Sequence, residues 1–248
     1  KERKDIITEW AKNKPNDFFL VNHVGHNSLK EAKALATHSA EKVDAIAALA
    51  PYYFKLNSLN SLLEYCKEIA SCAPNTPFYY YHIPVLTGAN FLMHEFLGLA
   101  SREIPNFAGI KFTNNNLIDY KYCKDFDNGA YNILFGFDEI LLASLPLGAE
   151  GWVGSTYNHL APLYLSIIEA FHNNDHKLAA ALQEKSMKFV DTLNAKGGFN
   201  GAAKSFMKVL GVDCGPSRFP HVTLSIEELK RAENELDDLG IMAYTSKF

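Results

Sequence analysis

The sequence predicts a β/α barrel of the TIM type, and three observations support this fold class. Short, continuously apolar runs alternate with amphipathic runs along the chain, which is typical of parallel strands that are covered by helices. No Gly-x-Gly-x-x-Gly motif follows an apolar run, so a dinucleotide-binding sheet is not favoured. Polar residues collect where the apolar runs end, and in a barrel those ends converge on one mouth.

The elements are expected in the following order. A helix comes first, over residues 1–13, with Ile6, Ile7 and Trp10 on one face. Six apolar runs are then predicted as strands, at residues 18–24, 45–49, 78–82, 107–112, 131–135 and 150–153. Helices are predicted between and after them, near residues 29–42, 59–70, 90–102, 117 onward, 138 onward, 160–171, 176–193, 202–209 and 226–236. Ser28 stands where the N-cap of the second helix is expected.

The number of strands bears on the domain organisation. Six strands are fewer than the eight of a closed barrel, and the sequence begins within a helix rather than on a strand. We therefore expect a barrel that lacks its first two β/α units. Residues 1–160 are expected to form this partial barrel, and residues 161–248 its final helix together with a C-terminal helical extension.

Composition excludes several classes of protein. With 248 residues and 48% hydrophobic content, the chain is long enough for one large core. The net charge of −4 and the scattered lysines leave no basic stripe for nucleic acid, and no apolar run approaches the roughly 20 residues that span a bilayer. The four cysteines form no Cys-x-x-Cys pair, which suits free thiols in a reducing compartment. These features favour a cytoplasmic protein that binds neither nucleic acid nor membrane.

Lys111 is the most informative single residue, because it ends an apolar strand between Ile110 and Phe112. Such neighbours would partly desolvate its ammonium group, and desolvation favours the neutral amine. A neutral amine can attack a carbonyl and form a Schiff base. On this run alone, a strand-end lysine that reaches solvent is the more ordinary interpretation.

No metal and no cofactor are expected. The pairs His23/His26 and His172/His176 have a spacing that suits two metal ligands, but no third ligand follows either pair. The run 197–201 contains three glycines before a helix but lacks the Lys-Ser/Thr of a phosphate-binding loop. Ordinary histidines and a helix-helix turn are therefore the favoured interpretations.

Several motifs occur together in one order along the chain, at residues 80–88, 109–113, 136–139, 154–158 and 215–220. With these motifs the sequence resembles the N-acetylneuraminate lyases, the sialic acid aldolases of the dihydrodipicolinate synthase superfamily. The resemblance covers essentially the whole chain. The resemblance implies that this sequence lacks the amino-terminal portion of the family, which holds the loop that binds the carboxylate of pyruvate.

The resemblance implies a Schiff-base aldolase that cleaves N-acetylneuraminate to pyruvate and N-acetylmannosamine. In that reaction Lys111 would attack the C2 ketone, and the protonated imine would accept electrons as the C3–C4 bond breaks. Tyr81 matches the tyrosine of the family that takes the proton of the C4 hydroxyl. Without the resemblance, a core tyrosine with its hydroxyl at the surface would be the ordinary interpretation of Tyr81.

Further residues match substrate contacts of the family: Thr113, Gly136, Asp138, Glu139 and Ser155. The last three would hold the hydroxylated tail of the sugar, a task that suits carboxylates because each accepts several hydrogen bonds. Asp138 could instead be a helix N-cap, and Glu139 an acid favoured in the first turn.

The substrate and the assembly are also expectations from the resemblance. Residues 85–87 stand where dihydrodipicolinate synthases carry an arginine for a second carboxylate, so an acidic aldehyde is disfavoured. His82 stands where bacterial relatives often have asparagine, and its role stays open. Tyr52 and Tyr53 occupy the place of a tyrosine that reaches a neighbouring subunit, which favours a homotetramer. The alternatives are a shortened non-catalytic isoform and a related 2-keto acid aldolase or synthase.

Overall fold

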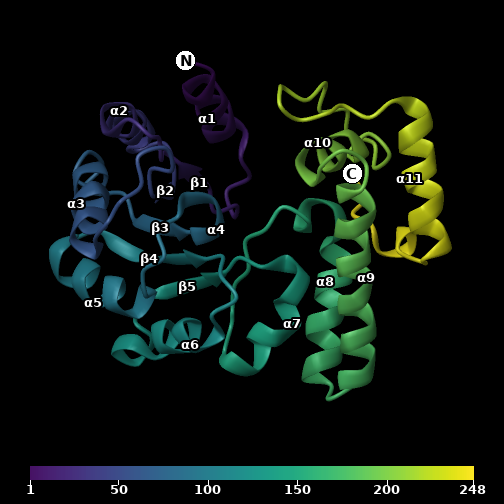
Figure 1. The fold of residues 1–248 in the computed structure, drawn as a ribbon. Coiled ribbons are helices and arrows are strands. Elements are labelled where there is room, and N and C mark those ends of the chain that lie inside the picture. The colour runs from purple at the N-terminus through teal and green to yellow at the C-terminus, as the bar shows by residue number, and fades with distance from the viewer. The chain divides into compact units, whose positions relative to one another are not determined.

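The computed structural model of the protein describes residues 1–248. The chain forms two compact units, which Figure 1 shows as ribbons. The first consists of Lys1–Gly136 with Leu147–Gly151, and the second of Phe137–Pro146 with Trp152–Phe248. The first unit contains the sheet and the second is helical, so each is described by itself.

The first unit contains one parallel sheet, with its strands in the order of the sequence. The strands are β1 (Val21–His23), β2 (Ala45–Leu49), β3 (Phe78–His82), β4 (Phe107–Phe112) and β5 (Asn132–Phe135). Neighbouring strands are separated by helices, as the alternation of apolar and amphipathic runs predicted. The α/β class with a parallel sheet is therefore confirmed.

The first unit also contains helices between and around these strands (Figure 1). They are α1 (Glu2–Asn13), α2 (Leu29–Ser39), α3 (Leu59–Ala70), α4 (Pro84–Thr87), α5 (Met93–Glu103), α6 (Leu117–Asp125) and the 3₁₀ helix η1 (Phe126–Gly129). Side chains cap three of them: Ser28 accepts a hydrogen bond from the backbone of α2, Ser58 from that of α3, and Asn116 from that of α6. Each cap satisfies an amide that the first turn leaves without a partner.

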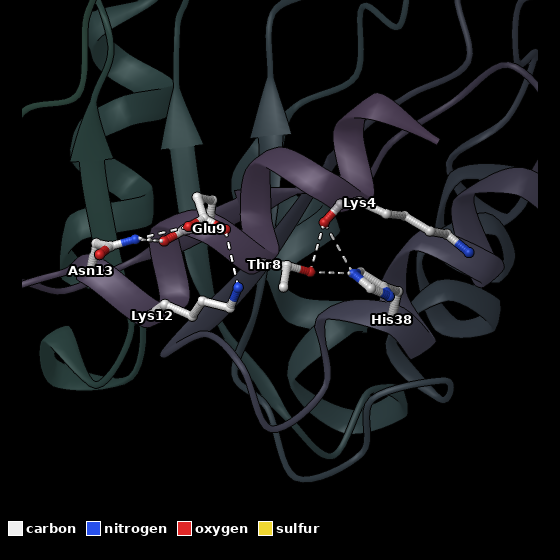
Figure 2. Close-up of polar contacts among 6 residues, drawn as sticks. All are labelled: Lys4, Thr8, Glu9, Lys12, Asn13 and His38. Carbon is white, nitrogen blue, oxygen red and sulfur yellow. Dashed lines mark hydrogen bonds and ion pairs between the residues drawn. The ribbon is translucent and has the colours of Figure 1, made fainter.

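The first helix packs on α2 through a polar contact (Figure 2). His38 Nε2 of α2 lies 3.1 Å from Thr8 Oγ1 and 3.2 Å from the carbonyl oxygen of Lys4. Only Ile7 is buried on α1, while Ile6 is 60% and Trp10 50% exposed. Of the three residues expected on one apolar face of this helix, only Ile7 is therefore buried.

The two faces of the sheet carry different side chains. Phe78, Tyr80 and His82 of β3 are fully buried, and Tyr80 packs on Phe96 of α5 with 4.9 Å between ring centroids. Successive side chains of a strand point to opposite faces, so Tyr81 projects from the face opposite to α5.

The expected strand at residues 150–153 is wrong, and the sheet has five strands instead of six. Only the carbonyl oxygen of Gly151 continues the ladder, by accepting a hydrogen bond of 2.9 Å from the amide of Phe135. Trp152 is a single bridge residue, and its indole donates to Ser144 Oγ at 2.9 Å. The run is short and bounded by Gly151 and Gly154, and glycine weakens a strand because it has no side chain to pack.

The first strand is also shorter than the predicted range of 18–24. Phe18 and Phe19 are 49% and 60% exposed and precede β1. The amide of Leu20 donates to the carboxylate of Asp44 at 2.7 Å rather than to a strand. A side chain thus satisfies the backbone here, and pairing begins at Val21.

The second unit is built around the neighbouring helices α8 (Tyr157–His172) and α9 (His176–Asn194), which lie side by side in Figure 1. The remaining elements are η2 (Asp138–Ile140), α7 (Leu141–Ser144), η3 (Leu145–Leu147), α10 (Phe199–Phe206), α11 (Ile226–Asp238) and η4 (Met242–Tyr244). Its core is formed by apolar side chains of α8, α9, α10 and α11, among them Leu163, Ile167, Phe189, Phe206 and Leu236. The late helices predicted from periodicity are confirmed. No helix of the chain has both the length and the apolar character that crossing a bilayer requires.

Candidate active site

Lys111 and Tyr81 lie side by side at the carboxyl ends of β4 and β3. The two residues are register partners, and Lys111 Nζ lies 4.0 Å from the centroid of the Tyr81 ring. A cation at this distance from a ring face is attracted by the negative potential of the π system. The structure therefore brings together the two residues that the sequence proposed as catalytic.

The side chains of Ile110 and Phe112 lie on the face opposite to that of Lys111, so they do not surround its amine. Ile110 and Phe112 are fully buried, but adjacent strand residues point to opposite faces of a sheet. Phe112 packs on His82, with 5.3 Å between ring centroids, on the helix-covered face. What surrounds Lys111 is the second face, where it is partly exposed and lies against Tyr81.

Thr113 and Gly136 complete this group. A Cβ atom added to Gly136 would lie 2.1 Å from Thr113 Oγ1 and 3.1 Å from Lys111 Cε, so only glycine leaves room there. Thr113 is 9% exposed, and its hydroxyl is buried with no hydrogen-bond partner. An unpaired buried hydroxyl is costly and calls for an explanation. We name Lys111, Tyr81, Thr113 and Gly136 the lysine group.

The ring of His23, which the sequence suggested only as half of a possible metal pair, lies next to this group. His23 lies edge-on to Tyr81, with 6.1 Å between ring centroids and 90° between ring planes. Its position at the end of a strand was visible in the sequence, but its contact with Tyr81 joins β1 to β3 and has no local signal. His26 Nδ1 accepts from the amide of Ser28 at 2.9 Å, and no three metal-ligating side chains gather anywhere in the chain.

Asp138 is held by a second segment of the helical unit. Its Oδ2 atom accepts hydrogen bonds from the amide of Thr156 at 2.9 Å and from Thr156 Oγ1 at 2.6 Å. A Cβ atom on Gly154 would lie 1.5 Å from Asp138 Oδ1, so that glycine admits the carboxylate. Asp138 is the first residue of η2, and the N-cap position is taken by Phe137.

Glu139 and Tyr157 lie near this carboxylate. Burial raises the pKa of Glu139 above its ordinary value, and the negative charges of Asp138 and Asp191 raise it further, although its own backbone amide lowers it. Burial also raises the pKa of Tyr157, whose hydroxyl is buried without a partner. Tyr157 stood within a recognised motif, but nothing in the sequence showed that its hydroxyl would be unpaired.

Ser155 is exposed and lines a pocket of about 370 Å³ in the same unit, together with Asn158, Asn200 and Lys204. Its carbonyl oxygen accepts a hydrogen bond from Asn158 Nδ2 at 3.1 Å. We name Asp138, Glu139, Ser155 and Tyr157 the acidic group. It offers carboxylates and hydroxyls, the groups that bind polyols.

Comparisons with known proteins identify the family of this chain. The profile of the Dihydrodipicolinate synthetase family matches residues 1–239. The N-acetylneuraminate lyase of Rattus norvegicus is 37% identical, over 98% of this chain and 77% of the relative. Among solved structures, the N-acetylneuraminate lyase (sialic acid aldolase) of Aliivibrio salmonicida is 33% identical with a TM-score of 0.92, over 99% of this chain and 81% of that chain.

A third similar protein is also a solved structure. It is a catalytic lysine mutant of the sialic acid aldolase of Ruminococcus gnavus, 28% identical with a TM-score of 0.86, over 96% of this chain and 79% of that chain. The family match extends over nearly all of the chain, and the recognition made from the motifs is confirmed. The chain belongs to the dihydrodipicolinate synthetase family, in which it is similar to the N-acetylneuraminate lyases.

Proposed function

We propose that the protein is a Schiff-base aldolase that cleaves N-acetylneuraminate to pyruvate and N-acetylmannosamine. The observation that carries the proposal is the contact of Lys111 with Tyr81 on the open face of the sheet, in a chain similar to N-acetylneuraminate lyases. A lysine amine and a neighbouring phenol are the groups that imine formation and proton transfer require.

Lys111 is the nucleophile in this reaction. Its amine attacks the C2 carbonyl of the open-chain sugar acid, water leaves, and a protonated imine forms. Tyr81 gives its phenolic proton to the departing water. The C3–C4 bond then breaks, its electron pair moves into the imine to give an enamine, and the phenolate oxygen of Tyr81 takes the proton of the C4 hydroxyl as C4 becomes an aldehyde. Protonation at C3 and attack by water release pyruvate and return the amine.

The remaining members of the lysine group fit substrate contacts. The unpaired hydroxyl of Thr113 gains a partner if it binds an oxygen of the substrate, which would remove the cost of its burial. Gly136 leaves space beside Lys111 Cε and Thr113 Oγ1. We assign Thr113 as a substrate donor and Gly136 as the residue that admits the substrate beside the imine.

The acidic group is proposed to bind the hydroxylated tail of the sugar. Asp138 already accepts two hydrogen bonds from Thr156, which orient its carboxylate. Glu139 is half-buried, so its carboxylate accepts fewer hydrogen bonds from water. The hydroxyls of a polyol would donate hydrogen bonds in place of that water. Ser155 lies at the open pocket and is assigned to the end of the tail.

The proposal extends to the barrel, the subunit assembly and the location of the protein. We propose that the sheet is part of an eight-stranded barrel, since the similar structures belong to a family of such barrels. A homotetramer is proposed from the family resemblance, and the exposed Tyr52, Tyr53 and Phe54 are suitable for a subunit contact. A cytoplasmic location stays a prediction, in keeping with four free cysteines.

The test of the proposal is chemical trapping. The protein is treated with pyruvate and borohydride, which reduces an imine to a stable amine, and the adduct is mapped by peptide mass analysis. We expect the adduct on Lys111, its loss in Lys111→Met, and its retention in Lys67→Met, which changes a surface lysine. An adduct confined to another lysine would show that the nucleophile is misassigned.

Substrate identity is tested separately by assaying N-acetylneuraminate alongside other 2-keto acid substrates. We expect N-acetylneuraminate to have the highest kcat/KM. Trapping on Lys111 with faster cleavage of another 2-keto acid would instead favour a related aldolase. Trapping without any cleavage would favour the non-catalytic alternative.

A further inference from the structure

The ring of His23 replaces a backbone acceptor at the point where β1 ends. The amide of Val24 still donates to the carbonyl oxygen of Ala47 at 2.7 Å, which is an ordinary ladder bond. The amide of Leu49 on β2, however, donates to His23 Nε2 at 3.2 Å. A side chain thus satisfies the next donor of β2, and the histidine ring is fixed to the backbone of a neighbouring strand.

Two further features hold this ring in place. Arg3 of α1 donates to the carbonyl oxygens of His23 and of Gly25, the latter at 3.1 Å. A Cβ atom on Gly25 would lie 3.0 Å from His23 Nε2, from His23 Cε1 and from the amide nitrogen of Leu49. The absence of a side chain at residue 25 therefore makes room for the ring, while Arg3 clamps the backbone on either side of Val24.

The ring is uncharged in this position. Because Nε2 accepts from Leu49, we assign the single proton of the neutral ring to Nδ1. Burial lowers the pKa of His23 to about 4, and the positive charges of Arg3 and Lys111 contribute to the shift. A protonated His23 ring would repel the protonated imine that the proposed reaction forms on Lys111. A neutral ring avoids this repulsion.

The fixed ring contacts the residue that the proposed reaction uses for proton transfer. His23 meets Tyr81 edge-on, with 6.1 Å between centroids at 90°, within the range preferred by aromatic pairs. Tyr81 in turn lies against Lys111 Nζ. We propose that His23 is a positioning residue for the aldolase reaction, which holds the Tyr81 ring where its hydroxyl can take the proton of the C4 hydroxyl. This inference rests on the proposed function.

Two substitutions separate the hydrogen bond from the ring contact. His23→Gln keeps an acceptor that can reach the amide of Leu49 but removes the ring. We expect an unfolding temperature close to that of the parent, with kcat reduced about tenfold, the effect of losing a good aromatic contact, and little change in KM. His23→Phe keeps the ring and removes the acceptor. It should restore kcat to within about threefold of the parent while lowering the unfolding temperature.

A double-mutant cycle tests whether His23 acts through Tyr81. If it does, His23→Gln should have almost no further effect on kcat in a Tyr81→Phe background, because the hydroxyl that the ring positions is already gone. An equal loss of kcat in both backgrounds, or a parent-like kcat in His23→Gln alone, would overturn the proposal.

A measurement that does not depend on activity distinguishes this proposal from the aldolase assignment. In protein with labelled tyrosine rings, the resonances of Tyr81 should shift in His23→Gln and move back toward the parent in His23→Phe. Unchanged Tyr81 resonances in His23→Gln would refute the positioning role even in an active enzyme. Failure of the parent to trap pyruvate on Lys111 would instead refute the aldolase function, and the resonances would still decide whether His23 holds the ring.

Discussion

Burial of the charged Glu139 carboxylate costs free energy when no substrate is bound. Glu139→Gln should lower kcat/KM for N-acetylneuraminate by about ten- to a hundredfold, since a hydrogen bond to a charged group contributes about 1.5–3 kcal/mol. Trapping of pyruvate on Lys111 should be unaffected, because the tail of the sugar is absent from pyruvate. Parent-like kinetics for the variant would remove Glu139 from the site.

The same substitution has a pH signature. The pKa of Glu139 is raised by folding, so above its unfolded pKa the unfolded state binds fewer protons than the folded state and stability falls as pH rises. Glu139→Gln should therefore unfold at a slightly higher temperature than the parent at pH 7, and this difference should vanish well below pH 4. The effect should be small, because solvent screens a partly exposed carboxylate. A lower unfolding temperature at pH 7 would contradict the shift.

Protonation of His82 should make the free energy of unfolding depend on pH in the opposite direction. His82 is fully buried, Nε2 lies 3.2 Å from Asn114 Nδ2, and burial lowers its pKa to about 4. Between about pH 4 and 6.5 the unfolded state therefore binds the additional proton, and stability is lost as pH falls through this window. In His82→Gln the loss of unfolding free energy between pH 7.5 and 4.5 should be smaller, by on the order of 3 kcal/mol.

Denaturant unfolding at the two pH values measures this difference, with the exposed His172→Gln as the matched control. The control should lose as much stability as the parent. His23 also has a lowered pKa, so some dependence should remain in His82→Gln. An unchanged dependence on pH in that variant would show that His82 is protonated equally in both states.

At the scale of elements, the residues that follow β4 and β5 lie so close together that residue 136 has no room for a side chain. The amide of Gly136 donates to the carbonyl oxygen of Phe112 at 2.8 Å, and its missing Cβ leaves room for Thr113 Oγ1. Gly136→Ala should displace Thr113 or Lys111 and lower kcat at least tenfold, since misplaced catalytic groups lose their orientation.

The matched control for Gly136→Ala is Gly98→Ala. Gly98 lies within α5, where an added Cβ would meet only Phe126, at 3.8 Å. Alanine there should leave activity unchanged and stabilise the helix by about 0.5–1 kcal/mol. Equal activity of the two alanine variants would show that the space beside Thr113 is not used in the reaction.

At the scale of the whole molecule, the proposed tetramer would bury apolar residues that are exposed in the single chain. Tyr53 and Phe54 are 75% and 82% exposed, and exposed apolar clusters often mark interfaces. We expect a tetramer in sedimentation velocity and smaller species for Phe54→Asp. Ile118→Asp is the control, because Ile118 is 68% exposed on a different element, α6. A parent protein that sediments as a monomer at all concentrations would contradict the tetramer.

The sequence by itself determined the features that depend on neighbours along the chain. Continuously apolar runs at 45–49, 78–82 and 107–112 predicted the central strands, and the structure confirms them with these bounds. Ser28 predicted a helix start because its hydroxyl can reach an amide three residues later. The order of the motifs also identified the family, which the comparisons confirm.

Only the tertiary structure decided the partners of individual side chains. Asp138 bonds to Thr156, which is 18 positions away, and no local pattern distinguishes that role from a helix cap. The run 150–153 was apolar enough to be a strand, yet it forms only a single bridge at Trp152, where the carbonyl oxygen of Gly151 accepts from the amide of Phe135. Lys111 lies on Tyr81 and His23 meets the same ring because parallel strands bring distant residues into register. Local propensity does not encode these contacts, since each requires that the sheet has already formed.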